Sequence, residues 1–87
     1  MEIVLSETAL KHIDYWKKTN NVKVQKRIIE LKDAILSNPY NGIGNPEPLK
    51  HELSGKWSRR INKEHRFIYH IDIENNTLYV LSLKGHY

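Results

Sequence analysis

The order of hydrophobic and polar positions in residues 1–37 predicts a short strand followed by two helices. Residues 2–5 are mostly apolar or β-branched, as is typical of a strand. Ser6 is suited to cap a helix, because its hydroxyl can accept a hydrogen bond from a free backbone N–H. Apolar side chains then recur at helical spacing, first at Ala9, Ile13 and Trp16 and again at Val24, Ile28, Leu31 and Ile35. Polar residues 19–21 separate the two helices, and Asn38, which precedes a proline, ends the second near Ser37.

Residues 39–48 hold three prolines and two glycines, which predicts a loop without regular structure. Glu47 lies between Pro46 and Pro48. Each proline ring fixes its own φ and biases the preceding residue toward an extended backbone, so Glu47 is expected on a stiff segment. A solvent-facing turn carboxylate is the simpler interpretation of this glutamate.

Alternating polarity predicts strands over residues 57–62 and 66–73 and a last strand over 78–83, with a turn at Asn75-Asn76. If the turn between the first two of these strands spans 62–64, Arg60 and Arg66 lie opposite each other on one face. Like charges so placed repel, and this arrangement is most easily explained by an anion between them.

This order of elements predicts an α+β fold. Each helix has one apolar stripe to bury, so both helices should pack on one face of a mainly antiparallel sheet and leave the other face for function. With 87 residues, the chain is expected to form a single domain over residues 1–87. No apolar run approaches the roughly 20 residues of a membrane span and no signal peptide is recognisable, so we expect a cytoplasmic protein without membrane contact.

The net charge of +4 comes almost entirely from residues 48–66, which carry six Lys or Arg against two acidic residues. Cationic side chains interleaved with aromatic rings suit a nucleic acid, because they neutralise phosphates and stack on bases. A solvated basic hairpin is the simpler alternative. The candidate substrate-binding residues are Lys50, His51, Trp57, Arg59 and Arg60.

Cysteine is absent, which excludes thiol catalysis and thiolate metal sites. The five histidines show no paired spacing of the kind zinc sites use, so we expect no metal and no cofactor. Metal-free RNA cleavage requires a base, cations around the phosphate and an acid. Those roles could fall to Glu47, to Arg60 and Arg66 with Lys50, and to His86. Lys50 could alternatively share the base role, and His86 and Tyr87 could simply be terminal residues.

The motifs closely resemble those of one family. They are Pro46-Glu47-Pro48-Leu49-Lys50-His51, Leu53-Ser54-Gly55, Trp57-Ser58-Arg59-Arg60-Ile61, Glu64-His65-Arg66 and the terminal His86-Tyr87. In this combination the sequence resembles the YoeB (Txe) toxins of the RelE/ParE superfamily over essentially its whole length.

The resemblance implies a bacterial type II toxin that enters the ribosomal A site, cuts mRNA there and leaves a 2′,3′-cyclic or 3′-phosphate. It implies inhibition by a YefM-like antitoxin of the Phd/YefM class, and an ability to form homodimers. By resemblance, Glu47 is the general base, Arg60 and Arg66 steady the scissile phosphate, and His86 is the general acid. Tyr87 positions the substrate and Lys50 assists.

Two other function classes stay open from the sequence. The basic stretch would also suit a non-catalytic module that binds RNA or DNA. A ParE-like protein that poisons a topoisomerase is the other alternative within the superfamily, and the complete set of Glu47, arginines and His86 argues against it.

Overall fold

The chain folds into a strand, two helices and then further strands, in the order that the sequence predicts. The computed structural model describes residues 1–85. The elements are β1 (Glu2–Leu5), α1 (Glu7–Lys18), α2 (Val22–Ser37), β2 (Glu47–Pro48), the short 3-10 helix η1 (His51–Leu53), β3 (Trp57–Arg60), β4 (Arg66–Asp72) and β5 (Thr77–Ser82). The predicted positions of both helices are therefore confirmed.

Polar side chains cap the beginning of each helix. The Ser6 hydroxyl accepts a hydrogen bond from the Ala9 N–H at 3.0 Å. The Asn21 side-chain oxygen accepts one from the Val24 N–H at 3.1 Å. Each bond satisfies a backbone donor that has no partner within the first helical turn. Asn20, between the helices, adopts the left-handed conformation (φ 55°) that asparagine tolerates better than most residues, and the chain reverses there.

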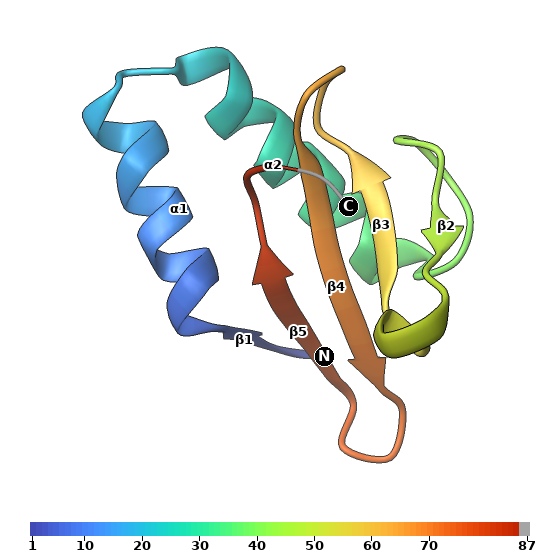
Figure 1. Cartoon of the computed structure of the whole chain (residues 1–87). Helices are drawn as coiled ribbons and strands as arrows, with labels where there is room; N and C mark the ends of the chain where they lie inside the picture. Colours follow the sequence, from blue (N-terminus) through green and yellow to red (C-terminus); the bar gives the residue numbers. More distant parts are fainter. Residues whose placement is uncertain (86–87) are drawn as a thin grey trace.

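The sheet has five strands in the order β1-β5-β4-β3-β2 (Figure 1). Strand β1 pairs with β5 in parallel, and all the other neighbouring pairs are antiparallel. Two helices packed on a five-stranded, mainly antiparallel sheet make up the α+β fold that the sequence predicts.

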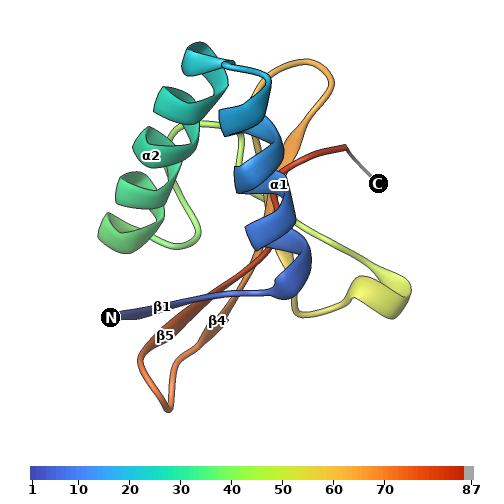
Figure 2. The ribbon, with the colours of Figure 1, turned by 90° about the vertical axis from the view of Figure 1, so that its left-hand side faces the viewer.

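Both helices cover the same face of the sheet. In Figure 1, α2 passes behind β4 and β3 while α1 runs beside β5, and Figure 2 shows the two helices from the side of α1. The core between helices and sheet contains Ala9, Trp16, Val24, Leu31, Ile35, Phe67, Tyr69, Ile71, Leu78 and Val80. We call the sheet surface turned away from the helices the distal face. Within residues 1–85, neither helix is long and apolar enough to cross a bilayer.

Apart from shifts of one or two residues at the ends of β3 and β5, the predicted strands differ from the structure in two places. The sequence predicts an irregular loop up to Pro48, but Glu47 and Pro48 form β2 at the edge of the sheet, where a proline without an N–H is tolerated. The sequence also places Ile73 in a strand, but β4 ends at Asp72 and Ile73 is 76% exposed. The Asp72 carboxylate accepts bonds from the backbone and side chain of Asn75, which closes the turn early.

Candidate nucleic-acid site

Arg60 on β3 and Arg66 on β4 lie directly opposite each other, as the predicted turn requires. The Arg60 N–H donates to the Gly44 carbonyl at 2.6 Å, away from β4. The Arg66 N–H donates to the Gly85 carbonyl at 2.8 Å, away from β3. The two arginines therefore form a non-hydrogen-bonded pair, the kind in which Cα atoms approach to about 4.5 Å. Their side chains share the distal face and are well placed to hold an anion between them.

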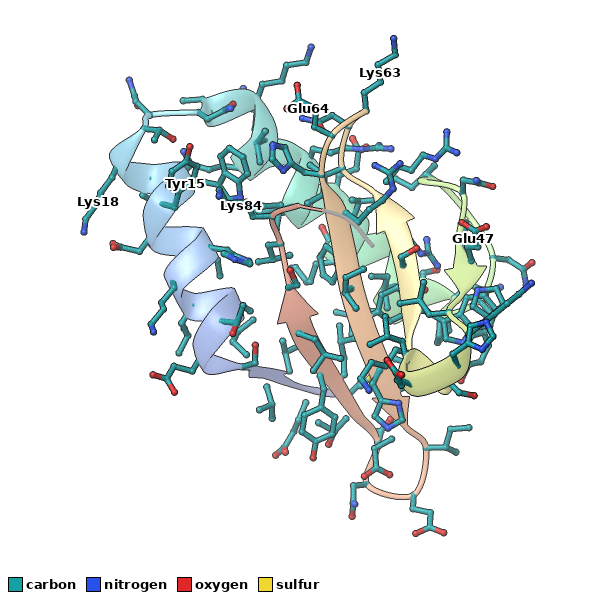
Figure 3. All side chains as sticks on the ribbon, viewed as in Figure 1. Tyr15, Lys18, Glu47, Lys63, Glu64 and Lys84 are labelled. Atoms are coloured by element: carbon teal, nitrogen blue, oxygen red, sulfur yellow. The ribbon has the colours of Figure 1, made fainter. Side chains whose placement is uncertain are left out.

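Strand β2 brings Glu47 to the distal face as well. Glu47 pairs with Ser58, which precedes Arg60 by two residues, so all three side chains lie on one side of the sheet. With about 3.4 Å per residue along a strand and about 4.8 Å between strands, the Cα atoms of Glu47 and Arg60 lie roughly 8 Å apart. Figure 3 shows Glu47 on β2, beside β3. Its side chain is exposed, so the carboxylate is accessible to a ligand on this face.

The two arginine side chains differ in their contacts. One guanidinium nitrogen of Arg66 donates to the carbonyls of Asn62 at 2.9 Å and Lys63 at 3.2 Å, so this side chain folds back on the β3–β4 turn. Arg60 is exposed, and its backbone is held on both sides, with its N–H bonded to Gly44 and its carbonyl accepting from Arg27 at 3.4 Å. The Arg60 side chain is therefore accessible to a phosphate bound on the distal face.

Lys50 and His51 lie just beyond β2, at the beginning of η1, and both are exposed. His51 has a left-handed backbone (φ 57°), which turns the chain sharply after Lys50. The half-buried Trp57 ring packs against Tyr40 with 4.9 Å between ring centroids. Trp57 pairs with the core residue Tyr69, so its ring lies on the helix side of the sheet and packs against the core. The structure thus argues against the predicted substrate contact of Trp57 on the distal face.

Arg59 does not lie where the sequence predicts. Its side chain is fully buried, on the helix side of the sheet. The guanidinium donates to the carbonyls of Asn38 at 2.5 Å, Asn41 at 3.0 Å and Ile43 at 3.2 Å. A guanidinium that is buried and saturated by backbone carbonyls is not available to a substrate. The structure thus argues against the predicted substrate contact of Arg59 and assigns the side chain a structural place.

The buried Arg59 organises the loop that leads to Glu47. Its guanidinium donates hydrogen bonds to three carbonyls within residues 38–43. The Tyr69 hydroxyl donates to a fourth, the Pro39 carbonyl, at 2.5 Å. Burial raises the pKa of the Tyr69 phenol, although the hydrogen bond from Arg59 partly opposes this. The loop is thereby fixed on the core just before it forms β2.

Sequence reasoning missed two histidines that contact the end of the described chain. His12 Nδ1 accepts a bond from the Leu83 N–H at 3.0 Å, and His65 Nδ1 accepts one from the Gly85 N–H at 2.9 Å. His65 belongs to the Glu64-His65-Arg66 motif, which could have drawn attention to it, whereas His12 carries no local signal. The predicted catalytic residues His86 and Tyr87 lie outside the described residues.

The distal face thus combines a carboxylate with two arginines on neighbouring strands. A carboxylate is able to accept a proton, and paired guanidinium groups stabilise charge on a phosphate. Within residues 1–85, no three His, Asp or Glu side chains gather in a group that could hold a metal ion. The chemistry that the Glu47 carboxylate and the two arginines offer is acid–base and electrostatic.

The chain is similar to known bacterial toxins. Residues 5–87 match the family described as "YoeB-like toxin of bacterial type II toxin-antitoxin system". Toxin YoeB of Synechocystis is 49% identical over 81 residues, 92% of each chain. The structure of a YoeB/ParE toxin from Agrobacterium tumefaciens superposes with a TM-score of 0.95, 33% identity and full coverage of both chains. A chain of the YoeB-YefM complex from Staphylococcus aureus superposes with a TM-score of 0.88 and 42% identity, covering 100% of this chain and 98% of that one.

Proposed function

This chain belongs to the family of YoeB-like toxins of bacterial type II toxin–antitoxin systems, as its motifs predict, and from that premise we propose that it is a ribosome-dependent mRNA endoribonuclease. The substrate is messenger RNA in the ribosomal A site, where the basic distal face also contacts ribosomal RNA. The reaction is acid–base attack of a 2′-OH on the adjacent phosphate, without a metal ion.

One observation carries this proposal: Glu47, Arg60 and Arg66 come from three adjacent strands and share one face of the sheet. A nucleic-acid module that only binds its ligand needs cations, and a carboxylate beside them repels phosphate. A carboxylate within reach of paired arginines is what general-base attack beside a phosphate requires.

In the proposed reaction Glu47 takes the proton from the 2′-OH, and the resulting oxyanion attacks the neighbouring phosphorus. Arg60 and Arg66 stabilise the charge that builds up on the phosphate oxygens. The bond from phosphorus to the 5′-oxygen breaks, and His86 gives its proton to that leaving oxygen. The products are a 2′,3′-cyclic phosphate, which hydrolysis opens to a 3′-phosphate, and a free 5′-OH. An imidazole suits the acid role because its ordinary pKa lies near 6.5.

The remaining predicted residues have supporting roles in this proposal. Lys50, beside β2, adds positive charge near Glu47, and His51 contacts the RNA chain. Trp57, on the helix side of the sheet, packs against Tyr40 in the loop before β2. Tyr87 positions the substrate. Arg59 acts from the interior, by holding residues 38–43 and so the strand that carries Glu47.

The proposed protein partner is a YefM-type antitoxin of the Phd/YefM class. The similar Staphylococcus aureus protein is described in a complex with YefM. A segment rich in acidic residues would cover the basic distal face and compete with RNA for Arg60 and Arg66. A homodimer and a cytoplasmic location remain predictions that go with this function.

Mapping of A-site cleavage on purified ribosomes tests the proposal. Glu47→Gln and His86→Gln should each lower the cleavage rate on the order of 10²–10⁴-fold, the usual value of one proton-transfer group. Glu52→Gln is the matched control, because Glu52 is an exposed acid on η1 and should cleave like wild type. Primer extension on the same mRNA would locate the cuts.

Undiminished cleavage by both Glu47→Gln and His86→Gln would contradict the proposed chemistry. If translation stops without any cut in wild type, the protein is a non-catalytic binder, and charge-removing variants should then lose affinity in proportion to their charge. Inhibition of purified gyrase in a supercoiling assay would instead support the ParE-like alternative.

A further inference from the structure

Four hydrogen bonds hold the backbone of Leu83 and Gly85, the two ends of the C-terminal segment, Leu83–Gly85, and the Ser82 hydroxyl donates to the Lys84 carbonyl between them at 3.2 Å. At one end, His12 Nδ1 accepts from the Leu83 N–H at 3.0 Å and the Trp16 indole N–H donates to the Leu83 carbonyl at 2.9 Å. At the other end, His65 Nδ1 accepts from the Gly85 N–H at 2.9 Å, and the Gly85 carbonyl accepts from the Arg66 N–H at 2.8 Å. The last described residue of the chain is therefore bonded to a site arginine.

The two histidines must be neutral to make these bonds. A backbone N–H can only donate, so the Nδ1 atom that receives it carries no proton and the ring proton lies on Nε2. Protonation would place an N–H of the imidazolium against the backbone N–H. Each bond to the C-terminal segment would then be replaced by a repulsive contact.

The surroundings of His12 favour its neutral form. The pKa of His12 is lowered first by burial, then by the positive charge of Lys84, and least by His65 when that ring is charged. His65 packs edge-on against Trp16, with 4.9 Å between ring centroids, and is flanked in the chain by Glu64 and Arg66. Lys84 is held over the Tyr15 ring, 4.7 Å from its centroid, and Figure 3 shows these two side chains side by side.

We propose that His12 and His65 are positioning residues, whose neutral Nδ1 atoms hold the C-terminal segment, Leu83–Gly85, beside Arg66. This inference rests on the proposed function, in which His86 is the general acid. Protonation of His12 removes the acceptor for the Leu83 N–H, so cleavage declines in acid as this bond is lost.

Matched variants distinguish the role of the Nδ1 hydrogen-bond acceptor from that of the imidazole ring. His12→Asn and His65→Asn keep an oxygen acceptor near the place of Nδ1 but do not titrate, whereas His12→Leu and His65→Leu remove the acceptor. At pH 7.5 the Leu variants should cleave ribosome-bound mRNA on the order of 10–10²-fold more slowly, the effect of a small misplacement of a catalytic group. Both Asn variants should stay within about threefold of wild type, and His12→Asn should retain more of its activity at pH 5.5.

Amide hydrogen exchange of the full-length protein tests the same contacts without reference to catalysis. The Leu83 N–H should lose protection in His12→Leu and the Gly85 N–H in His65→Leu, while the Asn variants keep both protected. The Ser6 N–H, which donates to the Val80 carbonyl at 2.9 Å, is the control and should stay protected in all four variants.

Leu variants that cleave like wild type, with the same pH profile, would overturn the positioning role and leave the proposed nuclease intact. Unchanged protection of Leu83 and Gly85 in the Leu variants would overturn it on structural grounds. If wild type does not cleave RNA, the proposed function fails, and the exchange measurement still decides whether the histidines hold the segment.

Discussion

Arg59 and Tyr69 are hydrogen-bonded to each other inside the core, with the Arg59 Nε–H donating to the Tyr69 hydroxyl at 3.3 Å. Both side chains are fully buried, and neither has a carboxylate partner among the bonds they make within residues 1–85. The cation is instead satisfied by carbonyls of the loop before β2. Since a buried charge without partners is very costly, the loop and the arginine stabilise each other.

Arg59→Met should destabilise the protein strongly. The substitution removes the donor of three part-buried hydrogen bonds to the carbonyls of Asn38, Asn41 and Ile43. A hydrogen-bond partner lost away from water costs about 1–3 kcal/mol. We expect the free energy of unfolding to fall by at least about 3 kcal/mol in urea denaturation followed by circular dichroism. Arg60→Met is the control, because Arg60 is exposed, and this substitution should not lower the free energy of unfolding. Equal effects of the two substitutions would contradict this assignment of Arg59.

Ionisation of Tyr69 should lower the free energy of unfolding at alkaline pH. Burial raises its pKa in the folded protein above the usual value near 10, so the unfolded chain loses the phenolic proton first. The stabilisation is complete below about pH 10 and is lost as pH rises toward the folded-state pKa. Unfolding free energies measured from pH 8 to 11.5 should show this decline in wild type.

Tyr69→Phe should lack that alkaline component and should be less stable by about 0.5–1.5 kcal/mol at pH 8, since the bond to Pro39 is lost. Tyr79→Phe keeps Tyr69 intact and should retain the decline. If the unfolding free energy of Tyr69→Phe declines with pH as steeply as that of wild type, a group other than Tyr69 is responsible for the decline.

Gly44→Ala should lower the free energy of unfolding strongly, and Gly55→Ala should lower it much less. Both glycines have positive φ (83° and 92°), which costs a side-chain residue about 1–2 kcal/mol. At Gly44 an added Cβ would also lie 2.7 Å from Leu31 Cδ2 and 3.0 Å from Arg59 Cβ, whereas nothing lies within 4 Å at Gly55. Thermal unfolding should therefore show a clearly larger loss for Gly44→Ala, by about 1–3 kcal/mol more. Similar losses at both positions would show that steric contact at Gly44 contributes little.

Arg60→Gln should stabilise the free protein and weaken its binding to RNA. Removal of one charge from the Arg60–Arg66 pair relieves repulsion of about 0.2–1 kcal/mol at low salt. The gain should largely disappear at 1 M salt, where the screening length is about 3 Å. Urea unfolding at both salt concentrations and a filter-binding assay with RNA would measure the two effects.

Lys23→Gln is the control, because it removes an exposed charge at the beginning of α2. It should change neither the free energy of unfolding nor the affinity for RNA by much. If Arg60→Gln lowers the stability at low salt, the two arginines do not repel each other in the free protein.

Local patterns in the sequence were enough to predict both helices and the pairing of Arg60 with Arg66. Ser6 caps the first helix through a bond that spans three residues, and apolar side chains at helical spacing define its buried stripe. The Arg60–Arg66 register depends only on the length of the turn that joins two consecutive strands. Such features are decided within a few residues of the chain, so sequence alone determines them.

The tertiary structure alone decided which arginine is buried and what holds the end of the described chain. Arg59 is satisfied by carbonyls 16 to 21 residues earlier, and Leu83 is bonded to His12 across 71 residues. The alternating pattern puts Arg59 on the same face as Trp57 and Ile61. Arginine is usually exposed, however, so the sequence does not show that this guanidinium is buried among backbone carbonyls. A contact between distant segments forms only when the sheet brings them together, because spacing along the chain carries no information about which distant partner a polar group will meet.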